Sequence, residues 1–184
     1  MANTRERMVA SAAELFRAQG VHGTGVLAIL DRADAPRGSL YHHFPGGKAE
    51  LVLAGLEYET TRVSDELAAL LASDPDPVDA VLAFAEALAV TLELSNYRLG
   101  CPITTAALEL ANDDAAVRQL CADAYNSWQH AIGSQLRTRG IDQADQLAEA
   151  MLSAIEGALV LARVNRDADI VRRVAATTAG LVNR

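Results

Sequence analysis

The stretch that most constrains the fold covers residues 24–48 and reads TGVLAILDRADAPRGSLYHHFPGGK. It predicts two short helices joined by a tight turn, because Pro36 suits the first position of the second helix and Pro45-Gly46-Gly47 would end it. Leu40 and Phe44 lie one helical turn apart and should be buried together. A helix this short does not persist alone, so it needs a scaffold. The stretch therefore indicates a helix-turn-helix whose second helix would enter the major groove of DNA.

Long helical repeats continue through the rest of the chain and predict an all-α protein of nine helices. Of the 184 residues 51% are hydrophobic but only 4% are aromatic, so Leu, Val, Ile and Ala must supply most of the core. No apolar run reaches the roughly 18 residues that cross a bilayer, and the N-terminus has no signal-peptide core, which predicts a cytoplasmic protein without a membrane partner. The expected helices span residues 4–19, 26–33, 36–44, 48–72, 78–94, 103–111, 115–139, 143–164 and 167–182.

The net charge of −8 is unfavourable for a protein that binds nucleic acid, which is expected to show a basic surface. The charge is unevenly distributed, however. Residues 1–50 hold six Arg or Lys against five Asp or Glu, whereas residues 51–184 hold ten against nineteen. The acidic excess therefore lies outside the helix-turn-helix. Its basic residues near expected helix starts could gather on one surface, and these are Arg5, Arg7, Arg37 and Lys48.

The sequence shows no pattern of a catalytic or metal site. Cys101 and Cys121 are too few for a disulfide framework, and we expect two reduced thiols, with a redox switch as the minor alternative. There is no CxxC motif and no His/Cys cluster with zinc spacing. Nor do the candidate residues form a nucleophile–base pair. We therefore expect no catalytic residues, no metal and no cofactor, and a protein that is not an enzyme.

The motif order resembles the TetR family of bacterial transcriptional regulators. A long first helix is followed by TGVLAILDRADAPRGSLYHHF and then by GGKAEL, which opens a further helix. The similarity covers about residues 5–52, and LYHHF followed by GGK is its most specific part. In the second half, GCPITTAALELA and IEGALVLARVNRD look like the LmrA-like branch, several members of which resemble regulators of drug-efflux genes. The resemblance implies a nine-helix TetR-like fold, with a three-helix DNA-binding head at residues 1–48 and a helical body for ligand binding and dimerisation at residues 49–184.

The expected DNA contacts combine residue chemistry with this resemblance. Arg37 is able to pair with a phosphate or a guanine edge, and Gly38 lets the backbone approach a phosphate closely. Tyr41 and Lys48 resemble the phosphate-contacting Tyr and Lys of the family. The alternatives are a solvated Arg37 or Lys48, a Gly38 that serves the turn alone, and a Tyr41 that packs in the head. The candidate DNA-binding residues are Thr24, Gly25, Arg37, Gly38, Ser39, Tyr41, His42 and Lys48.

The turn and the first helix of the motif depart from the family pattern. Asp34 stands where relatives often carry Gly, and Asp is among the few residues that tolerate the left-handed conformation common there. Pro36 replaces the usual Ser, which removes a side-chain cap worth about 1 kcal/mol. Leu27 and Ala28 occupy positions where relatives often place a polar DNA contact. We therefore expect the first helix of the motif to read few bases and mainly to hold the second in position.

Apolar and aromatic side chains in the body could line a ligand cavity between helices. For any single residue, ordinary core packing is the stronger interpretation, and Trp128 is the residue most expected to touch a ligand. Glu109 and Glu156 are acids that could receive a cationic ligand. The candidate lining residues are Phe84, Leu88, Leu92, Tyr97, Ile103, Leu108, Tyr125, Trp128 and Met151.

The last two helices carry small residues beside large aliphatic ones, which lets helices approach closely. One such pair from each of two subunits would form a four-helix interface, whereas an intramolecular core is the alternative. A helix-turn-helix normally doubles itself to read a palindrome, with half-sites one or more turns of about 34–36 Å apart, which favours the homodimer. The candidate interface residues are Met151, Ala154, Ile155, Ala158, Leu159, Val174, Thr178 and Leu181.

These features together predict a ligand-responsive repressor. The dimer would occupy a palindromic operator in double-stranded DNA and block a promoter. A small apolar or amphipathic effector would favour a state whose heads are wrongly spaced. The alternative is a helical ligand-binding or scaffold dimer that has lost specific DNA binding, which the acidic charge and the apolar Leu27 and Ala28 favour slightly.

Overall fold

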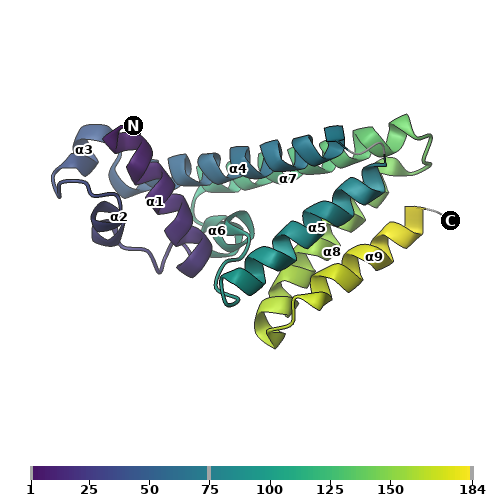
Figure 1. Cartoon of the computed structure of the whole chain (residues 1–184). Coiled ribbons are helices and arrows are strands. Elements are labelled where there is room, and N and C mark those ends of the chain that lie inside the picture. The colour runs from purple at the N-terminus through teal and green to yellow at the C-terminus, as the bar shows by residue number, and fades with distance from the viewer. Residues whose placement is uncertain (1, 74–75, 183–184) are drawn as a thin grey trace. The chain divides into compact units, whose positions relative to one another are not determined.

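The structure is a computed structural model that describes residues 2–73 and 76–182. Within these ranges the chain forms nine helices and no strand, which confirms the all-α prediction. Figure 1 shows α1 (Thr4–Gln19), α2 (Val26–Arg32), α3 (Ser39–His43), α4 (Gly47–Ser73), α5 (Pro77–Leu94), α6 (Pro102–Leu110), α7 (Ala115–Thr138), α8 (Ala144–Asn165) and α9 (Asp169–Val182). In this part of the chain no helix is both long enough and apolar enough to cross a membrane.

Sequence signals for helix ends account for the bounds of α1. Asn3 and Glu6 form a reciprocal capping box, in which Glu6 N–H donates to Asn3 Oδ1 over 2.9 Å and Asn3 N–H donates to Glu6 Oε2 over 3.0 Å. At the other end, Gly20 has a φ of 76° and its N–H still donates to the carbonyl of Phe16. Residues with a Cβ rarely adopt this conformation, so the chain leaves the helix at Gly20.

The third helix is shorter than predicted. It begins at Ser39 rather than at Pro36, and it ends at His43. Both the N–H and the hydroxyl of Ser39 donate to the carbonyl of Pro36, over 2.9 and 2.6 Å. These three-residue bonds fold the segment into a turn, so Arg37 and Gly38 precede the helix instead of opening it.

The described chain packs into two compact units. Unit 1 comprises Met1–Arg62 and Cys101–Ala122, and unit 2 comprises Val63–Gly100 and Asp123–Arg184. Unit 1 therefore contains the expected head, the first part of α4, the whole of α6 and the start of α7. Its core includes the fully buried side chains of Met8, Phe16, Phe44 and Leu51.

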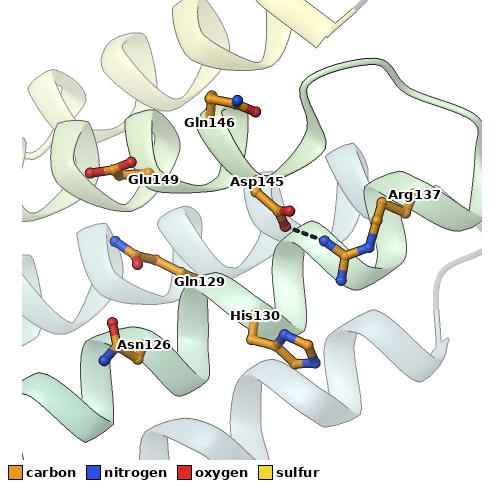
Figure 2. Close-up of a pocket in the computed structure, with 7 residues that line it drawn as sticks. All are labelled: Asn126, Gln129, His130, Arg137, Asp145, Gln146 and Glu149. Atoms are coloured by element: carbon orange, nitrogen blue, oxygen red, sulfur yellow. Dashed lines mark hydrogen bonds and ion pairs between the residues drawn. The ribbon is translucent and has the colours of Figure 1, made fainter.

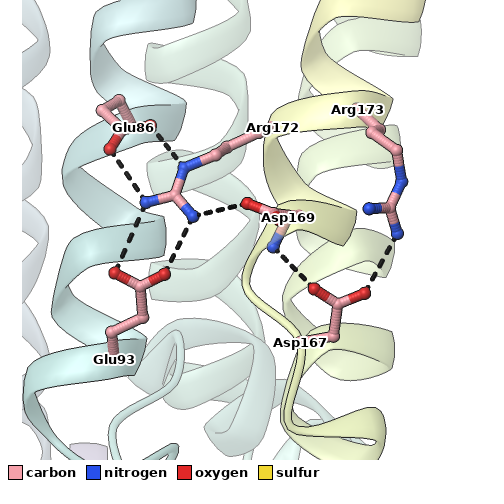
Figure 3. Close-up of polar contacts among 6 residues, drawn as sticks. All are labelled: Glu86, Glu93, Asp167, Asp169, Arg172 and Arg173. Carbon is pink, nitrogen blue, oxygen red and sulfur yellow. Dashed lines mark hydrogen bonds and ion pairs between the residues drawn. The ribbon is translucent and has the colours of Figure 1, made fainter.

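In unit 2, α9 packs along both α5 and α8 (Figure 1). Figure 3 shows how Arg172 of α9 joins α5: its guanidinium donates to Glu86 over 2.7 and 2.9 Å and to Glu93 over 2.8 Å. It also donates to Asp169 of its own helix over 2.8 Å. Hydrogen bonds to these three carboxylates raise the pKa of Arg172, and the bond from Arg172 lowers the pKa of Glu86. One cation thus holds three acids between two helices.

Candidate nucleic-acid interface and helical body

The α2–turn–α3 segment presents a polar outer face and an apolar inner face. Leu40 and Phe44 are buried, as their spacing predicts. On the other side Tyr41 is 71% exposed, and Arg37, Gly38 and His42 are also exposed. On α2 Leu27 and Ala28 are exposed as well, so the first turn of that helix presents apolar side chains outward, ahead of the exposed Asp31 and Arg32. The arrangement matches a short helix that offers hydrogen-bonding groups outward while its other face anchors it.

The turn between α2 and α3 is held by Arg7, which was expected on a basic surface and not at this turn. Arg7 of α1 donates from Nε to the carbonyl of Ala33 over 2.9 Å and from Nη2 to that of Asp34 over 3.1 Å. Asp34 has a φ of 47°, so it does take the left-handed conformation expected of it. The fork of Arg7 therefore fixes the turn at the residue where the chain reverses.

Two of the four basic residues expected to gather on one surface have protein partners instead. Arg7 is engaged at the turn, and Lys48 is half-buried, with Nζ donating to the carbonyl of Val21 over 3.2 Å. The guanidinium of Arg5 lies 5.0 Å from the ring centre of Phe44. Arg5 and Arg37 are both exposed, and Arg37 lies directly before α3.

Thr24 and Gly25 lie where α2 begins. Thr24 is 0% exposed and its hydroxyl donates to the carbonyl of Gly20 over 2.6 Å, which corrects the expectation that its side chain faces DNA. Thr24 serves the α1–α2 loop instead. Gly25 is exposed and is the N-cap of α2, without a side-chain cap.

Gly38 is a glycine that the fold itself does not require. Its φ of −81° and ψ of −6° are open to any residue, and a Cβ added there would meet no atom within 4 Å. Ser39, the next residue, is half-buried, and its hydroxyl bond to Pro36 leaves oxygen lone pairs available. The open space at Gly38 leaves its backbone accessible to a large partner.

The predicted ligand-lining residues divide between the two units. Ile103 is buried in unit 1, whereas Leu108 is 81% exposed, which corrects its expected place in an apolar cavity within the chain. The other seven lie in unit 2. The buried ones are Phe84, Leu92, Trp128 and Met151, and the half-buried ones are Leu88, Tyr97 and Tyr125.

Trp128 makes both a hydrogen bond and an aromatic contact within unit 2. Its Nε1–H donates to Ser64 Oγ over 2.9 Å, and its ring meets Tyr125 edge to face, with ring centres 5.7 Å apart. The hydrogen bond satisfies the indole N–H and the edge-to-face contact packs the ring within unit 2, so ordinary core packing explains the position of Trp128 in the free protein.

A polar groove of about 620 Å³ lies between α7 and α8 and was not predicted. Figure 2 shows Arg137 of α7 paired with Asp145 of α8. Gly133 allows this approach, because a Cβ there would lie 2.7 Å from Asp145 Oδ1. The groove is not among the predicted sites because those were chosen for apolar and aromatic residues, whereas its lining is polar: Asn126, Gln129, His130, Arg137, Asp145, Gln146 and Glu149.

The predicted dimer face is largely buried within its own chain. Five of the eight candidates are buried in unit 2, Ala154 and Val174 are half-buried, and Leu181 is 47% exposed; the buried five are Met151, Ile155, Ala158, Leu159 and Thr178. This corrects the side of the last two helices that was expected to pair with a second chain. The opposite side of α8 carries a row of exposed small and apolar residues at helical spacing, here called the α8 stripe: Ala150, Ser153, Gly157, Val160, Leu161 and Val164.

The cysteines and acids give no sign of a reactive centre in the described residues. Cys121 is buried, its thiol donates to the carbonyl of Ile103 over 3.6 Å, and burial raises its pKa. A thiol with a raised pKa is a weak nucleophile. No group of three or more His, Cys, Asp or Glu in the described residues could hold a metal ion.

Known family models match two parts of the sequence. The model described as bacterial regulatory proteins, tetR family, matches residues 9–54. The model described as transcriptional regulator LmrA/YxaF-like, C-terminal domain, matches residues 77–177. The first covers the helix-turn-helix, and the second covers α5, α6, α7, α8 and most of α9.

Similar proteins extend over almost the whole chain. An uncharacterised HTH-type transcriptional regulator of Mycobacterium tuberculosis is 33% identical over 183 residues, which cover 94% of this chain and 92% of the relative. The HTH-type transcriptional regulator LmrA of Bacillus subtilis is 27% identical over 184 residues, or 99% of this chain and 98% of LmrA. A crystal structure of a TetR transcriptional regulator from Chloroflexus aurantiacus is 31% identical, with a TM-score of 0.82 over 98% of this chain and 94% of that one.

Proposed function

The chain belongs to the TetR family of bacterial transcriptional regulators, and we propose that it is a repressor that binds a palindromic operator as a homodimer and is released by a small apolar or amphipathic effector. As a member of this family it is a DNA-binding regulator rather than an enzyme. The observation that carries the proposal is the exposed polar face before and along α3, formed by Arg37, Gly38, Tyr41 and His42.

This face has the chemistry that DNA recognition needs. Arg37 supplies the planar donors that pair with phosphate or with a guanine edge, and His42 supplies a ring nitrogen. Tyr41 carries an exposed hydroxyl that suits a phosphate oxygen. Because α2 presents Leu27 and Ala28 outward, base reading falls mainly to α3 and the turn before it.

The proposed operator is found by selecting bound duplexes from a pool of random-sequence DNA. We expect one enriched sequence made of two inverted half-sites. Failure to enrich any sequence would contradict the repressor and favour a helical ligand-binding or scaffold dimer without specific DNA binding.

Lys48 is proposed to use its remaining N–H donors on a phosphate. Lys48→Ala should then weaken binding to the selected operator about equally for all sequence variants, and should reduce the slope of log K against log salt by about one. The control is Arg98→Ala, which removes the same charge from an exposed residue of unit 2. Equal slopes for the two variants would remove Lys48 from the phosphate contacts.

The α8 stripe supports the proposed homodimer. Exposed apolar residues repeat along its length, and Gly157 at its centre would let a second helix approach closely. Ile170, Val174 and Leu181 of α9 add partly exposed aliphatic side chains in the same unit. Pairing of α8 and α9 with the same helices of a second chain would cover this surface as a four-helix bundle.

The proposed effector site is the apolar part of unit 2 around Trp128. An effector acts only if it binds the two states of the protein with different affinity, so its pocket must differ between them. The chain has a single Trp, which makes its fluorescence a local reporter. Any compound that releases the operator should change the emission of Trp128. Operator release without a change in Trp128 emission would show that the effector binds elsewhere. The polar groove between α7 and α8 would then be the next candidate.

A further inference from the structure

A carboxylate from α6 binds the loop that leads into the helix-turn-helix. Glu109 Oε2 accepts the backbone N–H of Val21 over 2.7 Å and that of His22 over 2.9 Å. The two bonds span 88 and 87 residues of sequence and lie within unit 1. Hydrogen bonds that involve a charged group are roughly twice as strong as neutral ones.

The loop is shaped around this carboxylate. Gly20 has a φ of 76°, and a Cβ there would lie 2.1 Å from Glu109 Oε1, so a larger residue at position 20 would displace the acid. On the other side of the same peptide segment, Lys48 Nζ donates to the carbonyl of Val21 and the hydroxyl of Thr24 donates to that of Gly20. Side chains from α4 and α6, together with Thr24 of the loop itself, therefore fix its backbone.

The position of α2 depends on this loop. α2 has only seven residues, and its N-cap Gly25 supplies no side-chain bond. A helix of this length does not hold itself together in water. Arg7 fixes the C-terminal end of α2 through the turn, which leaves the loop at residues 20–24 to fix its start. Freedom in the loop therefore passes to the start of α2, the first helix of the helix-turn-helix.

We propose that Glu109 is a positioning residue for DNA binding, which holds the α1–α2 loop from α6 and so sets the fraction of molecules whose helix-turn-helix is ready to bind. Glu109 itself touches no DNA. α6 belongs to the segment matched by the LmrA/YxaF-like C-terminal domain, yet it packs in the same compact unit as α1, α2 and α3. Glu109 is thus a point at which the C-terminal part of the sequence acts on the DNA-binding motif. The inference rests on the proposed binding of an operator.

A positioning role has a signature that differs from a contact role. When only a fraction of the protein is competent, the apparent dissociation constant rises by the inverse of that fraction. The bound state is unchanged, so the number of phosphates contacted and the salt slope stay the same. Loss of an acidic charge near DNA acts in the opposite direction, since by charge alone it would tighten binding.

The test compares Glu109→Gln with the matched variant Asp113→Asn on the selected operator. Both substitutions remove one negative charge from the segment that follows the start of α6, and Asp113 is exposed. Affinity is measured at a temperature where circular dichroism shows both variants fully folded, so a merely lowered global stability has no effect. We expect Glu109→Gln to weaken binding about tenfold with an unchanged salt slope, and Asp113→Asn to bind as well as the wild type or slightly better.

Equal affinity of the two variants would overturn the positioning role, and so would a shallower salt slope for Glu109→Gln. If the wild type selects no sequence at all, the proposed operator binding fails instead, which is a separate result. Hydrogen exchange on the wild type without DNA tests the same bonds if Glu109→Gln does not fold. The amides of Val21 and His22 should exchange slowly although they lie in a loop. Exchange at the rate of an unstructured peptide would overturn the proposal.

Discussion

At the scale of single residues, Gly38 separates the demands of the fold from those of the proposed function. Neither its backbone angles nor its surroundings require a glycine. Replacing it with Ala should raise the free energy of unfolding by up to about 1 kcal/mol, because the unfolded chain loses freedom. The added methyl group would project into the space that a phosphate is proposed to occupy.

We therefore expect Gly38→Ala to fold at least as well as the wild type in urea denaturation and to bind the operator at least tenfold more weakly, a loss of about 1.4 kcal/mol. Gly180→Ala is the matched control, since a Cβ there would also meet no atom within 4 Å. Wild-type affinity of Gly38→Ala would show that the glycine serves no DNA contact.

The sequence predicted those residues whose partners are close in sequence. Leu40 and Phe44 are one turn apart, and Asp34 is in a turn that needs a positive φ, so local rules were enough. Arg7 and Glu109 bind backbone groups 26 or more residues away, and nothing in their local pattern reveals those partners. Thr24 was wrong as a DNA contact, because tertiary packing buries its side chain and its hydroxyl bonds to Gly20 instead.

At the scale of helices, the sequence correctly predicted which helices form and in what order. It did not always predict which side of a helix packs within the chain. Bounds agree within about two residues except at the start of α3, where Ser39 bonds to Pro36 and closes a turn. On α8 both faces carry small and apolar residues, so periodicity alone cannot distinguish the face that packs on α5 and α9 from the α8 stripe. Only the packed structure shows which face its own chain has already used.

The contact between α5 and α9 should depend on pH. Its hydrogen bond with Arg172 lowers the folded-state pKa of Glu86 below the value in the unfolded chain, about 4.3. The stability that this bond contributes is therefore complete above that unfolded value and is lost as the pH falls through the folded-state pKa. We expect Arg172→Met to lower the Tm at pH 7, and the difference from wild type to shrink as the pH falls below about 4.

The control for this experiment is Arg173→Met on the same helix, whose partner is the single carboxylate of Asp167. It should lower the Tm much less at pH 7, because it binds one acid instead of three and is more exposed. A difference for Arg172→Met that stays constant from pH 7 to pH 3, or one matched by Arg173→Met, would show that the network does not hold α9 to α5.

At the scale of the whole molecule, dimerisation should depend on the α8 stripe rather than on the buried face first predicted. Leu161→Asp places a charge among exposed apolar residues that a second chain is proposed to cover, and the cost of burying it should shift the protein to monomers. Leu94→Asp is the control, since Leu94 is still more exposed in the same unit but lies on α5.

Sedimentation velocity at micromolar concentration should give a dimer for the wild type and for Leu94→Asp, and a folded monomer for Leu161→Asp. A wild-type monomer would contradict the dimer itself. A dimeric Leu161→Asp would place the interface elsewhere on the chain.

Two helix-turn-helix motifs of one dimer are proposed to read two half-sites together. This proposal is tested most directly by measuring affinity for the selected operator, for the same duplex with one half-site scrambled, and for one with about 5 base pairs inserted between the half-sites, roughly half a turn of DNA. We predict tight binding to the intact operator alone, with both altered duplexes bound at least a hundredfold more weakly, about 2.7 kcal/mol. Equal affinity for all three duplexes would show that the two motifs do not read two half-sites together.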